Sequence, residues 1–128
     1  MSAFSPRQMF LLDLACQPLA EAFRHLGYGV FLVGTAAERG EYRDVDVRMI
    51  LDDKSYDKLA KTSSVEGMAF LGLAIGQYLA SMTDLPIDFQ IQRMTEANAK
   101  HGGKTRNPLG VRGLTNFRGD AVPEPNDG

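Results

Sequence analysis

Three aspartates in two parts of the chain have the spacing of a metal-binding site. Asp44 and Asp46 flank one apolar residue, and Asp88 stands between Ile87 and Phe89. Alternate residues of a β-strand point to the same face, so Asp44 and Asp46 are expected on one face of a strand and Asp88 on the polar face of another. Carboxylate oxygens are the ligands that Mg²⁺ prefers, together with the phosphates of a nucleotide. If the two strands are neighbours, the carboxylates converge as metal-dependent phosphoryl transfer requires.

A turn that precedes the aspartates adds a phosphate-binding element. Gly34 and Thr35 follow an apolar run, and Arg39 lies between this turn and Asp44. A glycine lets backbone N–H groups approach phosphate oxygens, a threonine hydroxyl donates to one, and an arginine binds phosphate in a bidentate manner. Taken separately, these residues are an ordinary turn glycine, an exposed hydroxyl and a solvated loop charge. Their order along the chain favours one nucleotide site.

One basic residue is predicted to lie among the carboxylates. Arg48 alternates with Asp44 and Asp46, so it projects from the same strand face and is expected to neutralise part of their charge. On the other strand, Gln90 and Gln92 share the face of the third aspartate. We interpret them as an exposed polar surface, with contact to a base or an acceptor as the alternative.

Apolar periodicity predicts the elements that position these residues. A first helix begins at a capping box of Ser5 and Gln8, is expected to be kinked at Pro18, and ends at Gly27. The order of elements predicts an α/β (α+β) domain. The remaining elements are expected as strands at 28–33, 44–51 and 87–92, a helical region from about residue 54 that is broken around 62–64, and a short helix at 95–100.

The run from Gly34 to Val47 resembles the signature of the minimal nucleotidyltransferases of the DNA polymerase β superfamily. That signature is an apolar-Gly-Ser turn followed by Asp-apolar-Asp-apolar. The resemblance covers most of the chain up to about Arg93. It implies a small nucleotidyltransferase-like domain, with a short mixed sheet of three or more strands and helices packed on one face.

The resemblance also implies a role for each candidate residue. The turn holds the triphosphate of an NTP, the paired aspartates hold two Mg²⁺ or Mn²⁺ ions, and the later aspartate completes one metal site and helps to activate the attacking hydroxyl. The nucleotide-binding residues are then Gly34, Thr35 and Arg39, and the catalytic and metal-binding residues are Asp44, Asp46 and Asp88.

Composition indicates one small domain without a strong global charge. The chain has 128 residues and a net charge of -2, so no overall field draws it to nucleic acid or to a membrane. Cys16 is the single cysteine, and its place in an apolar helical stripe predicts a buried thiol. The apolar runs are shorter than a membrane span and no targeting segment is evident, so we expect a cytoplasmic protein with no membrane partner.

The character of the chain changes after Arg93. We therefore divide it into a nucleotidyltransferase-like core at 1–93 and a basic, Gly/Pro-rich C-terminal tail at 94–128, which is expected to be partly disordered. From residue 93 to residue 118 there are six basic residues and one acid, a net charge of +5. This segment is either a solvated terminus or an arm that folds over the site or grips a polyanion such as RNA.

Together these residues predict transfer of a nucleoside monophosphate from an NTP to a hydroxyl acceptor. Small stand-alone members of the resembling family often act as antitoxins that adenylylate a helical ribonuclease-type toxin. A protein acceptor is therefore the first choice, and RNA or a small molecule the second. The alternative is a catalytically degenerate domain that acts by stoichiometric protein binding. Arg48 on the acidic face, and Thr35 where the family usually has serine, support this alternative.

Overall fold

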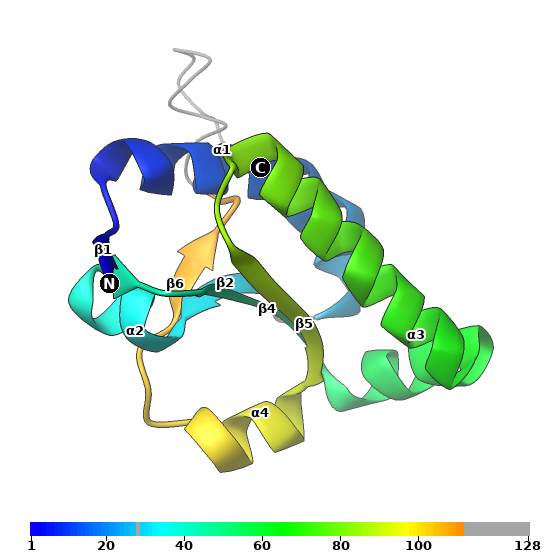
Figure 1. The fold of residues 1–128 in the computed structure, drawn as a ribbon. Coiled ribbons are helices and arrows are strands. Elements are labelled where there is room, and N and C mark those ends of the chain that lie inside the picture. Colours follow the sequence, from blue (N-terminus) through cyan, green and yellow to red (C-terminus); the bar gives the residue numbers. More distant parts are fainter. Residues whose placement is uncertain (28, 112–128) are drawn as a thin grey trace, which may run out of the picture.

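The computed structural model describes residues 1–27 and 29–111, and the structural statements below refer to these residues. Helices and strands are interspersed along this part of the chain (Figure 1). The strands are β1 (Ser2–Ala3), β2 (Gly29–Val33), β3 (Glu41–Tyr42), β4 (Val45–Leu51), β5 (Ile87–Arg93) and β6 (Asn107–Leu109). The helices are α1 (Pro6–Phe23), α2 (Gly34–Arg39), α3 (Asp53–Thr83) and α4 (Met94–His101), with a 3₁₀ turn at Arg24–Leu26.

Four strands form the main sheet, in the order β5-β4-β2-β6. β4 and β5 pair in parallel, whereas β2 is antiparallel to both β4 and β6. A parallel pair needs a long crossover connection, and α3 supplies it between β4 and β5. β1 and β3 form a separate two-stranded sheet. The mixed sheet and its helices confirm the predicted α+β class.

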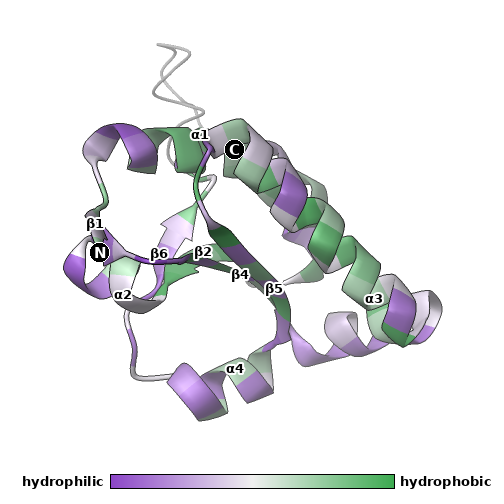
Figure 2. Cartoon of the chain, in the orientation of Figure 1, coloured by the Kyte–Doolittle hydropathy of each residue, from purple (hydrophilic) through white to green (hydrophobic). Residues whose placement is uncertain are grey.

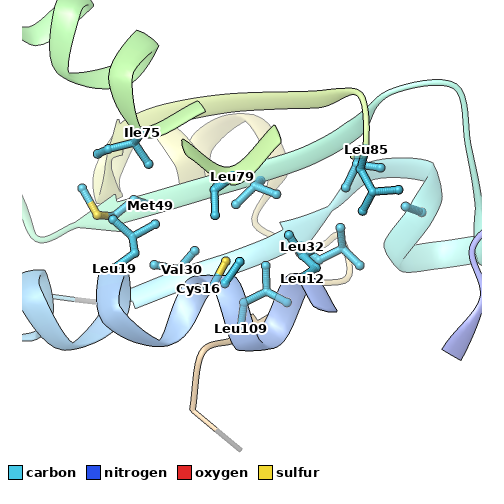
Figure 3. Close-up of a cluster of buried hydrophobic side chains, with 14 of the residues drawn as sticks. Leu12, Cys16, Leu19, Val30, Leu32, Met49, Ile75, Leu79, Leu85 and Leu109 are labelled. Atoms are coloured by element: carbon cyan, nitrogen blue, oxygen red, sulfur yellow. The ribbon is translucent and has the colours of Figure 1, made fainter. Parts of the chain in front are cut away.

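The two long helices pack on the same face of the main sheet and enclose the core (Figures 1 and 3). Val45, Val47 and Met49 of β4 are fully buried, so the apolar face of this strand is turned toward the helices. α4 lies on the opposite side of the sheet (Figure 1), where the side chains of Ile50 and Ala97 are buried apart from the main cluster. That cluster includes Leu12, Cys16 and Leu19 of α1, Val30 and Leu32 of β2, and Ile75 and Leu79 of α3.

The start of α1 has the predicted capping box. The hydroxyl of Ser5 accepts a hydrogen bond from the backbone N–H of Gln8 at 3.1 Å, and the Gln8 side chain accepts one from the Ser5 N–H at 2.8 Å. These two bonds satisfy donors that the first turn of a helix leaves unpaired. Further along α1, burial raises the pKa of the Cys16 thiol to about 12, and the Asp13 carboxylate adds to this effect. The thiol is buried, as predicted.

α3 is broken near its middle, as the sequence predicts. Ser64 has φ 68 and ψ 171, which no α-helix contains. Its hydroxyl accepts a hydrogen bond from the N–H of Gly67 at 3.2 Å, so it caps the second half of the helix. The helix ends at Asp84, whose φ of 59 closes the last turn.

α3 is also an apolar helix with an exposed side. An 18-residue window reaches a mean hydropathy of 1.2 and passes a length and composition test for a membrane span, although a single such helix is weak evidence for one. The uninterrupted apolar runs are short, as expected, because glycine, serine and glutamine interrupt them without adding charge. Ile75 and Leu79 pack in the core, while Phe70 and Leu73 are 69% and 59% exposed. Hydrophobic stretches along α3 are visible in Figure 2.

The sheet continues past Arg93, where the sequence analysis ends the core. β6 pairs with β2, and Leu109 is fully buried. Gly110, with φ 77, donates its N–H to Asp13 Oδ1 at 2.7 Å, and a side-chain carbon there would lie 2.5 Å from the backbone oxygen of Cys16. A three-residue strand with one buried apolar side chain gives no periodic signal, which is why the sequence pattern misses it. The rest of the predicted tail, residues 112–128, lies outside the described residues.

We expect Leu109→Ala to destabilise the protein by about 2–5 kcal/mol, because it leaves a cavity where a side chain is fully buried. Urea unfolding of the full chain measures this change. Val111→Ala is the matched control, since Val111 is 62% exposed and its truncation should change the free energy of unfolding by about 0.5 kcal/mol or less. Equal effects of the two substitutions would show that β6 does not belong to the cooperative core.

Candidate active site

The parallel pairing of β4 and β5 brings two of the predicted aspartates together. Asp46 is the register partner of Asp88, and Arg48 is the partner of Gln90. Since the alternate residues of β4 are buried beneath the helices, Asp46 and Arg48 face the opposite side of the sheet. Asp44 precedes β4 instead of forming part of it. The convergence of the carboxylates thus comes from strand register.

The predicted glycine turn lies directly beside the first of these carboxylates. Val33, the last residue of β2, pairs with Asp46, and Gly34 follows with φ 73. A side-chain carbon on Gly34 would overlap Oδ2 of Asp46, and a positive φ disfavours other residues as well. Thr35 and Arg39 continue from this turn along α2. Glycine is therefore favoured here mainly by the positive φ, and an added side-chain carbon would also displace the Asp46 carboxylate.

The Arg48 guanidinium lies between the two paired carboxylates. Its Nη2 is 3.8 Å from Oδ1 of Asp46 and 3.7 Å from Oδ2 of Asp88. Its Nη1 donates to the backbone oxygens of Asp88 at 2.6 Å and of Val47 at 3.0 Å. The Arg48 side chain is only 12% exposed, so these contacts hold it in the sheet surface. The arginine provides the positive charge that a metal ion would otherwise provide.

All three predicted aspartates interact at Asp46. Burial raises the pKa of the Asp46 carboxyl above its usual value, the Arg48 charge lowers it, and the charges of Asp88 and Asp44 raise it again. The direction of the total is upward. One arginine therefore does not fully compensate the burial of Asp46 and its crowding with two other carboxylates.

A cavity of about 540 Å³ opens above this polar face of the sheet. Gly34, Thr35 and Arg39 line one side of it, and Asp46 and Arg48 form part of its floor. The opposite wall, across the cavity from α2, is formed by α4 and by the segment that leads to β6. In Figure 2, α2, α4 and this segment are largely hydrophilic. Four of the six predicted site residues thus share one cavity.

The other two predicted residues line a neighbouring cavity. Asp44 and Asp88 border a space of about 690 Å³ between β5 and α3. Within residues 1–27 and 29–111, no group of three or more His, Cys, Asp or Glu side chains is arranged to hold a metal ion. The donor chemistry fits a hard cation, because Asp46 and Asp88 offer carboxylate oxygens on adjacent strands. Such an ion requires Arg48 to move away from both.

Sequence reasoning does not assign a site role to the basic residues on the far wall of the first cavity. Lys100, His101, Lys104 and Arg106 all line it. By sequence they belong to the predicted basic tail, for which an arm over the site is one interpretation. Their positions depend on the return of the chain from α4 to β6, and no local pattern predicts that return.

Comparisons of the chain with protein-family models, with curated proteins and with solved structures found no match. The nucleotidyltransferase resemblance therefore depends on the motif residues of the sequence. The geometry adds that the glycine turn, Asp46 and Asp88 are neighbours in space.

Asp46→Asn is expected to raise the melting temperature at pH 7 in a metal-free buffer with EDTA. A carboxyl whose folded-state pKa is raised stabilises the fold below its unfolded pKa of about 3.8, and loses that contribution as pH rises through the folded value. Asparagine stays uncharged, so the difference from wild type should shrink as the pH is lowered toward 3.8. Thermal melts from about pH 3.5 to about pH 8 test this, because stability depends on pH wherever the folded and unfolded states bind different numbers of protons.

Glu66→Gln serves as the control for this pH series. Glu66 is exposed on α3, and no ion pair involves it among the described residues. The control should melt like wild type across the range. A lower melting temperature for Asp46→Asn at pH 7 would mean that attraction to Arg48 outweighs burial and crowding.

Proposed function

We propose that this protein transfers a nucleoside monophosphate from an NTP to a hydroxyl acceptor, with Mg²⁺ or Mn²⁺ as cofactor. The observation that supports this best is the in-register pairing of Asp46 with Asp88 next to the Gly34 turn. A second support is the cavity that joins this turn, Thr35 and Arg39 to Asp46. The proposed compartment is the cytoplasm.

In this proposal the three aspartates are the ligands of two metal ions. Asp44 and Asp46 would hold both ions, and Asp88 would complete the second site. Divalent cations at such a site neutralise the triphosphate and lower the pKa of a bound hydroxyl. Asp88 is exposed on the edge strand β5, where an acceptor hydroxyl has access to it.

The phosphate chain is held on the α2 side of the cavity. Gly34 allows close approach of the backbone, Thr35 donates its hydroxyl, and Arg39 binds phosphate oxygens in a bidentate manner. The acceptor oxygen attacks the α-phosphorus, the bond to the β-phosphate oxygen breaks, and pyrophosphate leaves. The acceptor proton passes to a carboxylate or to solvent. The rate comes from positioning and charge neutralisation.

Arg48 is the residue that must respond to the metal. In the arrangement described above it contacts both carboxylates and two backbone oxygens. A divalent ion at these carboxylates would compete with Arg48 for them, and Arg48 also lines the cavity above the sheet. Arg48 then acts as a counter-charge for the metal-free protein.

A protein acceptor, such as the helical ribonuclease-type toxin implied by the resemblance, is supported by the exposed apolar side of α3. Val65, Phe70 and Leu73 are 82%, 69% and 59% exposed. Exposed apolar clusters of this kind are typical of protein interaction surfaces. RNA or a small molecule remains the second choice of acceptor.

Non-catalytic binding of a protein partner is the second candidate function, and a specific observation favours it. The 12% exposed Arg48 pairs with both Asp46 and Asp88, as a basic residue does in a carboxylate site that no longer binds metal. The same α3 surface would then act by stoichiometric contact alone.

We expect the melting temperature to rise when Mg²⁺ or Mn²⁺ is added. An ion at ten times its dissociation constant stabilises the folded state by about 1.4 kcal/mol. Arg48→Ala should tighten metal binding, because it removes the competing charge, and it should leave transfer activity intact or raise it. Calorimetric titration and thermal melts measure both effects. A wild-type protein indifferent to both ions, with and without NTP, would rule out the metal site.

The reaction is tested with α-labelled and γ-labelled NTPs. The wild-type protein should transfer the α-label to an acceptor, either a candidate protein partner or RNA, and release the γ-label only in pyrophosphate. Asp46→Asn or Asp88→Asn should each reduce the rate by about 10²-fold or more, since each removes a preorganised charge.

Asp84→Asn is the matched control for these variants. Asp84 is exposed, lies close to Asp88 in the chain, and has a φ of 59, which asparagine also adopts without strain. It should transfer label at the wild-type rate. If Arg48 proves essential while the aspartates are dispensable, the catalytic proposal fails and non-catalytic binding replaces it.

A further inference from the structure

Strand pairing brings a residue from the C-terminal segment beside the glycine turn. β6 is antiparallel to β2, with Asn107 opposite Leu32. The two strands run in opposite directions, so Arg106, which precedes Asn107, is at the end of β2 that leads through Val33 into Gly34. Arg106 and the turn also line the same cavity. Residues about 70 positions apart in the chain are thus neighbours at one edge of this cavity.

The Arg106 guanidinium has no acceptor among the described residues. Its Nη2 is buried and makes no hydrogen bond, and no hydrogen bond or ion pair involves the side chain in residues 1–27 and 29–111. A guanidinium carries five N–H donors, and a charged donor that is buried without a partner is unfavourable. Arg106 can therefore donate hydrogen bonds to a bound anion.

Other basic residues stand on the same wall. Lys100 and Lys104 line the cavity beside Arg106, together with His101. Across the whole lining, five Lys or Arg residues face two acids, which leaves a net charge of +3 with histidine neutral. Among the described residues, the one lining arginine or lysine with a carboxylate partner is Arg48. The uncompensated charge therefore lies on Arg39 and on the wall formed by Lys100, Lys104 and Arg106.

We propose that Arg106, with Lys100 and Lys104, forms a phosphate-binding wall that grips the polyphosphate of a nucleotide, and that this binding does not require a divalent cation. That the ligand is a nucleotide rests on the proposed function. That it carries a polyphosphate is inferred from the net positive charge of the cavity lining and from the unpaired Arg106 guanidinium. A cavity of about 540 Å³ has the size of a small-molecule site. Because Arg106 borders the glycine turn, the anion lies within the cavity and not along an extended nucleic-acid track.

Calorimetric titration of the full chain with pyrophosphate, in EDTA and without metal, tests this wall. The wild type should bind, and Arg106→Gln should bind about 10-fold more weakly or worse, since a charge-assisted bidentate contact is lost. Arg106→Lys should recover part of the affinity, because it restores the charge without the fork. Lys100→Gln with Lys104→Gln should also weaken binding, and all three losses should shrink at high salt.

Lys58→Gln with Lys61→Gln is the matched control. Both lysines are exposed on α3, neither lines the cavity, and the double change removes the same charge. This variant should bind pyrophosphate as the wild type does. Thermal melts of every variant separate a loss of binding from a loss of folding, and the conservative Arg106→Lys keeps the test valid if Arg106→Gln fails to fold.

Several outcomes overturn the inference. They are a wild type that does not bind pyrophosphate, equal losses in the wall variants and the control, and a wall that binds a single-stranded oligonucleotide but not pyrophosphate. The same variants in the α-label assay separate the two proposals. Label transfer with unchanged pyrophosphate affinity in Arg106→Gln would leave the transferase proposal standing and refute the wall. If Arg106→Gln loses pyrophosphate binding, and neither the wild type nor any variant transfers label, the result would support the phosphate-binding wall and refute the transferase proposal.

Discussion

The parallel pairing of β4 with β5 is the constraint on which the rest of the structure depends. It requires the long crossover α3, which in turn covers the apolar face of the sheet beside α1. The same register that buries Val45 and Val47 puts Asp46 opposite Asp88 on the other face. A shift by one residue would turn the carboxylates into the core and the valines into the cavity. The register of β4 against β5 therefore determines both which side chains are buried in the core and which carboxylates meet in the site.

Local signals predict most of the fold, because they act over a few residues. The capping box of Ser5 and the break at Ser64 are such signals, and the structure contains both. The alternation around Asp46 correctly predicts which side chains share a face, and the buried valines explain why. β6 escapes prediction, since its place depends on pairing with β2 and on one buried leucine. The position of the basic wall is not predicted either, although its charged residues are evident in the sequence.

The site itself balances opposing charges across a partly buried surface. Asp46 is unfavourably buried near two other carboxylates, and Arg48 offsets part of that energy while it satisfies backbone oxygens. A metal-binding site and a degenerate site are thus both compatible with this arrangement. They differ in whether divalent ions displace Arg48 from the carboxylates. The chemistry of the donors allows the first, and the 12% exposure of Arg48 shows how well the second is stabilised.

The late position of β6 in the chain has a consequence for synthesis on the ribosome. The hydrogen bond from Gly110 to Asp13 joins residues 97 positions apart, and Leu109 fills the core between them. A nascent chain has α1, β2, β4 and β5 available before β6, since β5 ends at Arg93 and β6 begins at Asn107. Because contacts between distant residues form slowly, the edge of β2 stays open to chaperones or to other chains until then. The pairing that adds β6 to the sheet also brings Arg106 to the cavity, so sheet completion and assembly of the basic wall happen together.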